Sequence, residues 1–199
     1  MRAVRARVAT TADAAAVTDL FALAFYEDPT WSWAFSDPGT RMEGHRAMWG
    51  LEVNSAIPYG WVWLTDGCGA AALWIPPGEH DLNEEDQAAH EPLLREHVGP
   101  GADEVLELVD EFAANRPTEP HYYLSLLGTH PDRRGRGEGM ALLEDNLERI
   151  DAQGAAAYLE STNPDNNHRY EARGFAQVGE FTTPNEASPV VACMWREPR

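Results

Sequence analysis

Residues 121–154 run from a strand through a glycine-rich turn into a helix, and this unit constrains the fold more than any other feature of the chain. Residues 121–129 (HYYLSLLGT) are almost all apolar or aromatic, which predicts a central strand that is buried on both faces. The next segment, 131–139 (PDRRGRGEG), leads directly into a helix with one apolar face and Gly154 as its C-cap. A unit of this kind among other helices and strands predicts an α/β or α+β sandwich.

The turn itself has the composition of a phosphate site. Its glycines allow the backbone to approach a ligand closely and to adopt positive φ. The first amides of the following helix are unpaired and lie at the positive end of the helix dipole. Arg133, Arg134 and Arg136 add three positive charges to the turn. The spacing Gly-x-Gly-x-Gly, in a chain without lysine, fits neither the P-loop nor the dinucleotide fingerprint, so the sequence predicts a pyrophosphate site of another kind.

Periodicity and chain breakers predict the remaining elements of a single domain that spans residues 1–199. Asp28-Pro29 is expected to end the first helix, because the residue before a proline avoids helical angles. The predicted elements are a strand at 2–9, a helix from Thr10 or Thr11, an aromatic loop at 30–38, a helix at 40–55, strands at 61–66 and 69–76, two helices broken at 99–101 within an acidic insertion at about 79–115, a strand at 155–161, a short helix at 166–173, and strands at 175–181 and 189–195.

The charge of the chain restricts its partners. Thirty-three acids oppose fifteen arginines, for a net charge of −18, which repels nucleic acid and anionic membrane surfaces and favours a small cationic substrate. The acidic run at 79–111 either attracts such a substrate or is a solvated helix face. Two cysteines indicate free thiols, and no signal peptide or membrane-spanning stretch is apparent, so we expect a cytoplasmic protein. The scattered histidines do not indicate a metal site.

Three segments together resemble the GNAT N-acetyltransferases. Residues 127–139 are similar to the acetyl-CoA-binding motif of that family, and 158–161 and 166–175 are similar to its later strand and its Tyr-Glu-x-x-Gly-Phe segment. The layout further resembles that of the puromycin N-acetyltransferase-like members. The resemblance implies the GNAT fold, a mixed central sheet of about six to seven strands that is splayed at the cofactor site and flanked by helices.

The resemblance also implies acetyl-CoA as cosubstrate and assigns residues to it. Backbone groups of Leu127, Gly128 and Thr129 are expected to bond the pantetheine arm, and Asn166 the pantetheine or phosphate region. Glu138 is an acid inside the phosphate loop, so we expect its side chain to point to solvent. The amides expected to hold the pyrophosphate are those of Arg134, Gly135, Arg136, Gly137, Glu138, Gly139 and Met140.

The chemistry that the resemblance implies is direct attack of an amine on the thioester. Tyr170 matches the family's general acid, since a phenol is protonated at neutral pH and can donate to the leaving sulfur; otherwise it is a core tyrosine. The general base stays open, with Glu160 and His121 as the main candidates. Tyr122 and Glu27 are further candidates.

Aromatic residues and acids upstream of the motif predict the acceptor pocket. A flat or drug-like cationic amine would suit such walls. The residues expected there are Tyr26, Glu27, Trp31, Trp33 and Tyr122.

The function expected from all of this is an N-acetyltransferase acting on a primary amine of a small cationic molecule, an antibiotic or a metabolite. Two alternatives stay open: a sensor that binds acetyl-CoA without catalysis, and a peptide or protein Nα-acetyltransferase. The sequence is compatible with a monomer or a homodimer.

Overall fold

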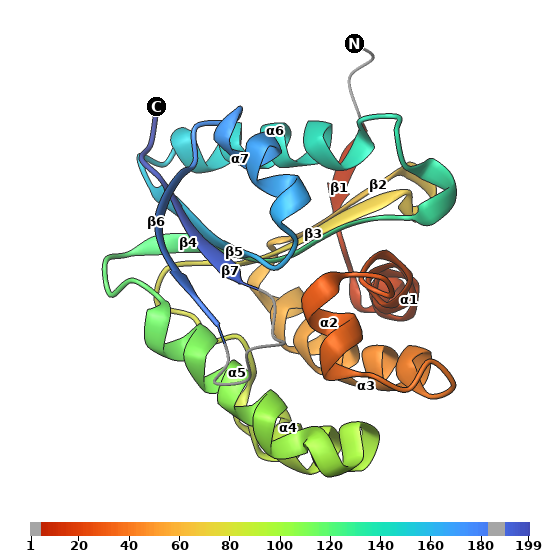
Figure 1. The fold of residues 1–199 in the computed structure, drawn as a ribbon. Helices are drawn as coiled ribbons and strands as arrows, with labels where there is room; N and C mark the ends of the chain where they lie inside the picture. Colours follow the sequence, from red (N-terminus) through yellow and green to blue (C-terminus); the bar gives the residue numbers. More distant parts are fainter. Residues whose placement is uncertain (1–4, 183–189) are drawn as a thin grey trace.

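The computed structural model describes residues 5–182 and 190–199 and is built around one mixed sheet (Figure 1). Its seven strands lie in the order β1-β2-β3-β4-β5-β7-β6. Within the described residues β4 and β5 are the one parallel pair, and all other neighbours run antiparallel. The strands are β1 (Ala6–Val8), β2 (Val62–Thr65), β3 (Ala70–Ile75), β4 (His121–Thr129), β5 (Ala156–Ser161), β6 (Ala176–Phe181) and β7 (Val191–Arg196). This sheet confirms the predicted mixed architecture; parts of the predicted strands at 2–9 and 189–195 lie outside the described residues.

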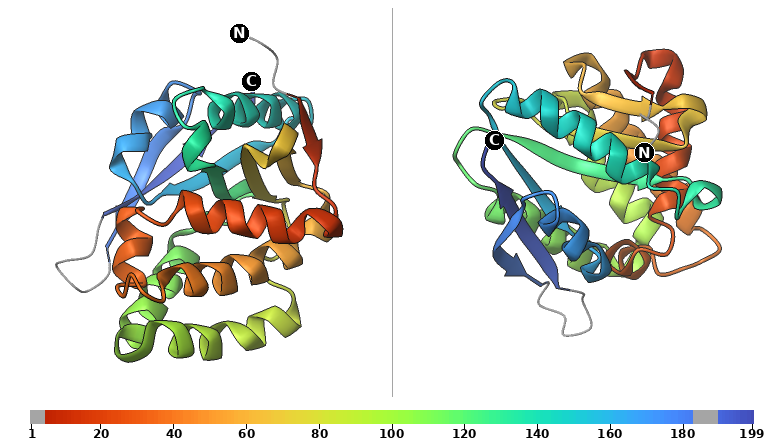
Figure 2. Two further views of the ribbon diagram at one scale, coloured as in Figure 1. Left: turned by 90° about the vertical axis from the view of Figure 1, so that its right-hand side faces the viewer. Right: turned by 90° about the horizontal axis from the view of Figure 1, so that it is seen from above.

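Helices cover both faces of the sheet. In Figure 1, α6 and α7 lie on one side and α1 to α5 on the other, with α4 farthest from the sheet. Figure 2 shows the same arrangement from two further directions. The helices are α1 (Ala14–Ala24), α2 (Pro29–Ala34), α3 (Arg41–Ala56), α4 (Glu84–Val98), α5 (Ala102–Asn115), α6 (Glu138–Asp151) and α7 (Asn167–Glu171). The two predicted acidic helices are therefore present as α4 and α5, on the face opposite α6.

The segment after α1 differs from its prediction. The first helix ends at Ala24 and not at Asp28, and residues 30–38, expected to be a loop, begin with the short helix α2. Pro29 occupies the first position of this helix, where its fixed φ is favourable and no amide donor is needed. The Asp28 carboxylate caps it by accepting hydrogen bonds from the amides of Thr30 and Trp31. The dipeptide that was expected to end the first helix thus begins the second.

The parallel strands separate halfway along their length. Pairing of β4 with β5 ends at Leu124 and Leu159, although β4 stays paired with β3 as far as Thr129. The register between β3 and β4 shifts at the same point, so that Ser125 is an extra residue in β4, a β-bulge. Ser125 and Glu160 are therefore the first residues on the two sides of the gap.

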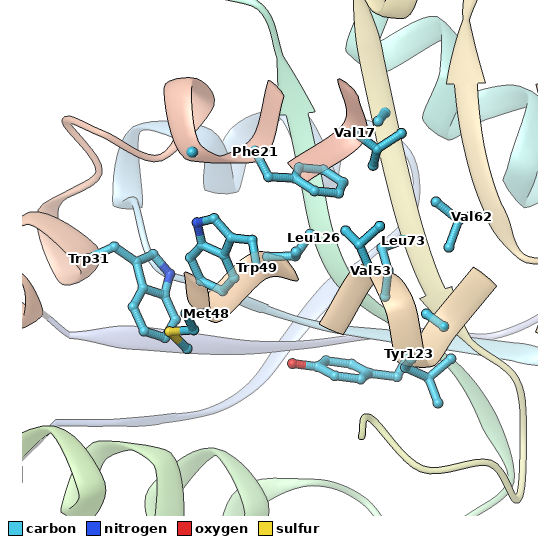
Figure 3. Packing of buried hydrophobic residues seen from close by; sticks show 14 of the residues in the cluster. Val17, Phe21, Trp31, Met48, Trp49, Val53, Val62, Leu73, Tyr123 and Leu126 are labelled. Carbon is cyan, nitrogen blue, oxygen red and sulfur yellow. The ribbon is translucent and has the colours of Figure 1, made fainter. Parts of the chain in front are cut away.

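Buried aromatic side chains fill the face that α1 to α5 cover. Figure 3 shows Trp31 from α2 and Met48 and Trp49 from α3 gathered together, with the phenol oxygen of Tyr123 on their side of its ring. The Trp31 and Trp49 rings meet edge-on with centroids 4.8 Å apart. Burial of such side chains contributes roughly 1.5–3 kcal/mol each to stability and fixes α2 and α3 on the sheet.

Candidate active site

A groove of about 800 Å³ lies where β4, the glycine-rich turn and α7 meet. Gly135 and Gly137 adopt φ of 76° and 77°, the left-handed region that other residues avoid. A Cβ on Gly139 would run into the Thr129 hydroxyl, so only glycine allows the helix start to lie this close to β4. The residues predicted to contact the cofactor that line this groove are Leu127, Gly128, Thr129, Arg134, Gly135, Gly137, Glu138, Gly139, Met140, Asn166 and Tyr170.

The charged side chains of the turn are held by the surrounding backbone. Arg134 donates a hydrogen bond to the carbonyl of Ala24 at 2.7 Å, which ties the turn to the end of α1. Arg136 is not among the residues that line the groove; it donates to the carbonyl of Asp132 at 3.1 Å.

Glu138 does not point to solvent, contrary to the expectation from its place in the loop. Its side chain is 16% exposed and pairs with Arg133 at 2.8 Å. The carboxylate lies over Gly69, where the missing side chain leaves room for it. The pairing neutralises the acid within the turn, so it does not repel an anion in the groove.

A second cavity, of about 290 Å³, lies on the face of the sheet that α1 to α5 cover. Many of its lining residues are aromatic or apolar. Its acidic residues come from five different elements and loops. Its acids are Asp28, Glu52, Asp81, Asp110 and Glu160. Arg116 is the one arginine among its described lining residues, and it binds Asp81 at 2.7 Å. The cavity is therefore acidic.

The two spaces meet where β4 and β5 separate. Six residues line both, and they come from the end of α1, the segment before α2, strand β4, the region between β5 and α7, and α7 itself: Phe25, Asp28, Leu127, Asn163, Asn166 and Tyr170. A ligand in the groove and another in the cavity would therefore approach each other beside Tyr170.

Tyr170 is suited to donate a proton at this junction. Burial, reinforced by the nearby charge of Asp28, raises the pKa of its phenol to about 12. Asp28 itself accepts a hydrogen bond from the Thr162 hydroxyl at 2.9 Å, and burial raises its pKa. The phenol is thus protonated at neutral pH and is available as a proton donor at this junction.

Glu160 is a buried acid without a fixed partner. Both of its carboxylate oxygens are inaccessible to solvent and form no hydrogen bond of ordinary geometry with the described residues. Burial raises its pKa to about 7, although the charge of Arg116 and the nearby phenols of Tyr123 and Tyr158 favour the charged form. A carboxyl with this pKa exchanges protons near neutral pH.

Glu52 is a second buried acid of the cavity, which the sequence reading missed. It accepts a hydrogen bond from the Ser125 hydroxyl at 2.7 Å, and burial raises its pKa to about 7. It lies on α3 three or four residues from the buried Met48, Trp49 and Ala56. An acid in line with the buried positions of an otherwise apolar helix face was the available signal.

Two of the predicted catalytic or pocket residues lie elsewhere. The Nδ1 atom of His121 donates to the carbonyl of Glu119 at 2.6 Å, and the ring does not line either space. Tyr122 belongs to the core beneath α6, on the opposite face of the sheet, and its hydroxyl donates to Gln153 at 2.8 Å. Strand alternation explains this, since Tyr123 and not Tyr122 faces the cavity.

The other predicted pocket residues are distributed over several places. Trp31 lines the cavity, whereas Glu27 lines the groove. Tyr26 lines neither and donates its hydroxyl to the carbonyl of Pro38. Trp33 packs against the core beneath α1 and α3.

Over the described ranges, 5–182 and 190–199, no cluster of three or more metal-ligating side chains is present. The helices of that same part of the chain include none long and apolar enough to cross a membrane.

Comparison with known proteins identifies the class of protein to which this fold and its two joined spaces belong. Residues 22–175 match the model of the acetyltransferase (GNAT) family. The chain therefore belongs to this family and is an acetyl-CoA-dependent acyltransferase. The groove fits that cosubstrate, because its glycine turn and the start of α6 form a cradle that added side chains would fill.

Solved structures of the family cover almost the whole chain. A Corynebacterium glutamicum protein, named as histone acetyltransferase HPA2 and related acetyltransferase, is 25% identical with a TM-score of 0.70, over 99% of this chain and 97% of its own. Arylalkylamine N-acetyltransferase 2 from Aedes aegypti is 12% identical with a TM-score of 0.68, over 98% and 99%. The polyamine N-acetyltransferase of Drosophila melanogaster, which forms N-acetylagmatine, is 16% identical with a TM-score of 0.65, over 98% and 99%.

Proposed function

We propose that this protein transfers the acetyl group of acetyl-CoA to a primary amine of a small cationic molecule while both are bound. The observation that carries the proposal is the acidic cavity that opens into the groove beside Tyr170. Acids in an enclosed aromatic space attract ammonium groups and disfavour anions. The amine-acetylating relatives agree with this choice of substrate class, although their low identities show only the fold.

The groove side binds and orients the cosubstrate. Acetyl-CoA supplies an activated acetyl thioester. The amides from Arg134 to Met140 would hold its pyrophosphate at the start of α6, and the backbone of Leu127 to Thr129 would align its arm along β4. Since β4 is free of β5 beyond Leu124, its backbone groups there are available to a ligand.

Side chains at the junction of the groove and the cavity accept and donate the protons of the reaction. The attacking amine must be neutral, so its proton has to leave for a nearby base. Glu160 fits this role, because its oxygens are unpartnered and its pKa of about 7 matches the task. Tyr170 gives its phenol proton to the departing sulfur as the C–S bond breaks, and its high pKa keeps that proton in place until then. The second proton that the nitrogen loses as the amide forms can return to the phenolate.

The test is a thiol-release assay with acetyl-CoA against a panel of amines: polyamines, aminoglycosides, aminonucleosides, amino acids and short peptides. Thermal unfolding with and without CoA runs beside it. Release with a small cationic amine supports the proposal. Thiol release with peptides alone would place the protein among peptide or protein Nα-acetyltransferases. A CoA-induced rise in Tm without thiol release with any acceptor would favour a sensor.

A further inference from the structure

The acids of the cavity differ in whether their charge is already compensated. Asp81 forms a bidentate pair with Arg116. Asp28 is occupied by the Thr162 hydroxyl and by two amides of α2. Both are therefore structural acids with a fixed set of donors.

Asp110, the fifth acid, lies at an exposed position of α5. Glu52 and Glu160 remain, and neither forms an ion pair with an arginine of the described residues. Glu160 has no hydrogen bond of ordinary geometry with the described residues, although the phenols of Tyr123 and Tyr158 lie near it, and Glu52 accepts a hydrogen bond from the neutral Ser125 hydroxyl. Arg116 lies within electrostatic range of both, but Asp81 already neutralises it and repels both acids. A buried carboxyl without a countercharge takes up a proton, and a cationic ligand can take the place of that proton.

The two acids stand on opposite sides of the gap between the parallel strands. Ser125 and Glu160 are the first residues beyond the last paired positions of β4 and β5. Ser125 holds the Glu52 carboxylate from α3 on the β4 side, while Glu160 belongs to β5. The two carboxylates therefore come from different elements, on either side of the gap, and can contact different parts of one ligand.

One reacting amine accounts for one of these carboxylates only. Glu160, as the base of the proposed function, takes the proton that the amine releases. Glu52 would then stay partly protonated or keep an unpaired charge, unless the same acceptor brought a second cation. We propose that the acceptor carries two basic groups, the primary amine that is acetylated and a second ammonium or guanidinium group that the Glu52 carboxylate binds.

The lining of the cavity indicates the chemistry of the acceptor segment that joins the two basic groups. Trp31, Met48, Trp49 and the Tyr123 ring are apolar or aromatic and line the same space (Figure 3). They fit a methylene or aromatic spacer, and the Trp faces can also contact a cation. This inference rests on the proposed function, since it concerns the acceptor of the same site.

The test compares the diamine putrescine with butylamine, a monoamine with the same number of carbons. Wild-type protein is expected to show a higher kcat/KM for putrescine, and Glu52→Gln should lower the ratio of the two values by about tenfold, the loss of one ion pair of about 1.4 kcal/mol. Glu43→Gln, at an exposed position of the same helix, is the matched control and should leave the ratio unchanged. Glutamine is nearly isosteric and can still accept the Ser125 hydrogen bond, so the fold should survive.

Calorimetry supplies a readout that does not need turnover. Near pH 7 Glu52 carries a proton part of the time, and binding of a second cation should expel it. Titrations without acetyl-CoA in two buffers of different ionisation enthalpy should therefore show more proton release with putrescine than with butylamine. Glu52→Gln should remove that difference.

The outcomes separate this inference from the proposed function. If both amines are acetylated with equal kcat/KM, or if Glu52→Gln keeps the wild-type preference, the inference is overturned and the acetyltransferase stands. If neither amine is acetylated but putrescine binds with a proton release that Glu52→Gln removes, the cation site stands and the proposed function fails. If neither amine binds, the inference is overturned.

Discussion

The groove and the cavity meet at Tyr170 but are built in opposite ways. One wall of the groove is largely backbone: a bulged strand, a glycine-rich turn and the first amides of α6, within residues 125–140. Side chains from residues 24–28 and 163–173 complete it. The cavity is made of side chains that come from five helices and loops between residues 25 and 170. The groove turn is rich in arginine, whereas the cavity holds five acids.

The difference reflects what each ligand requires. The pyrophosphate of the cosubstrate has the same shape in every reaction, so a fixed backbone cradle can bind it. Side chains are mainly excluded from that cradle. An acceptor amine has to be distinguished from other amines, which takes side chains of chosen charge and shape. The comparison implies that the two spaces respond independently to substitution, except at the residues that they share.

The largest effect is expected at the shared tyrosine. Tyr170→Phe removes the phenol proton and should lower kcat by about a hundredfold or more. The Kd for CoA, measured by calorimetry, should change by less than about twofold, since the ring still packs against Phe175. Tyr59→Phe, whose hydroxyl bonds the carbonyl of His80, is the control for loss of a phenol. An unchanged kcat would show that Tyr170 is not the proton donor.

The buried acids of the cavity predict a pH dependence of stability in the protein without acceptor. Glu52 and Glu160 have an ordinary pKa of 4.5 that burial raises to about 7. Between these values the folded state holds protons that the unfolded state has lost, so the free energy of unfolding falls as the pH rises.

The expected loss is on the order of 2 kcal/mol for each residue, complete somewhat above pH 7. Denaturant unfolding at several pH values measures it. Glu52→Gln and Glu160→Gln should each flatten the curve, whereas Glu43→Gln should not. Burial lowers the pKa of His45, His90 and His121, which act in the opposite direction, so the variants decide. A slope that neither Glu52→Gln nor Glu160→Gln changes would contradict the burial of the two charges.

Strain at the glycine turn should affect the groove and leave the cavity alone. Gly137 and Gly60 both have φ near +70°, at 77° and 71°, and in both cases an added Cβ meets open space. Gly137→Ala and Gly60→Ala should therefore lose similar stability, about 1–2 kcal/mol. Only Gly137→Ala should weaken CoA binding, by about tenfold, because it turns the amides away from the groove. Equal CoA affinities in the two variants would show that the turn does not hold the cosubstrate.

The smallest effect is expected from the acid inside the turn. Arg133→Gln frees the Glu138 carboxylate beside the groove and should raise the Kd for CoA about threefold. The double variant with Glu138→Gln should restore the wild-type Kd, since no unpaired acid is left. Calorimetry at low salt checks both values, and a double variant as weak as Arg133→Gln alone would mean that Arg133 itself contacts the ligand.

The same contrast explains what the sequence could predict. The strand, the turn and α6 follow from local rules, namely apolar runs, glycine and helix starts, and the predicted strand at 121–129 has the bounds of β4. The loop predicted at 30–38 failed because proline was read as a stop, although it also favours the first turn of a helix when Asp28 precedes it.

The cavity was harder to predict because its residues meet only through tertiary packing. Tyr122 and Tyr123 are neighbours in an apolar run, and only the register of β4 shows which one faces the cavity. Glu52 becomes visible as a site residue once α3 lies on the sheet and Ser125 bulges toward it. Single-sequence patterns carry no signal for such contacts between distant segments.

The most direct test of the account is the rate of thiol release with acetyl-CoA and either putrescine or γ-aminobutyrate. Both present a primary amine on a four-carbon chain, but the far end is a cation in one and an anion in the other. The acidic cavity predicts a kcat/KM at least about a hundredfold higher for putrescine. Equal rates, or a preference for γ-aminobutyrate, would contradict the claim that this cavity selects a cationic amine.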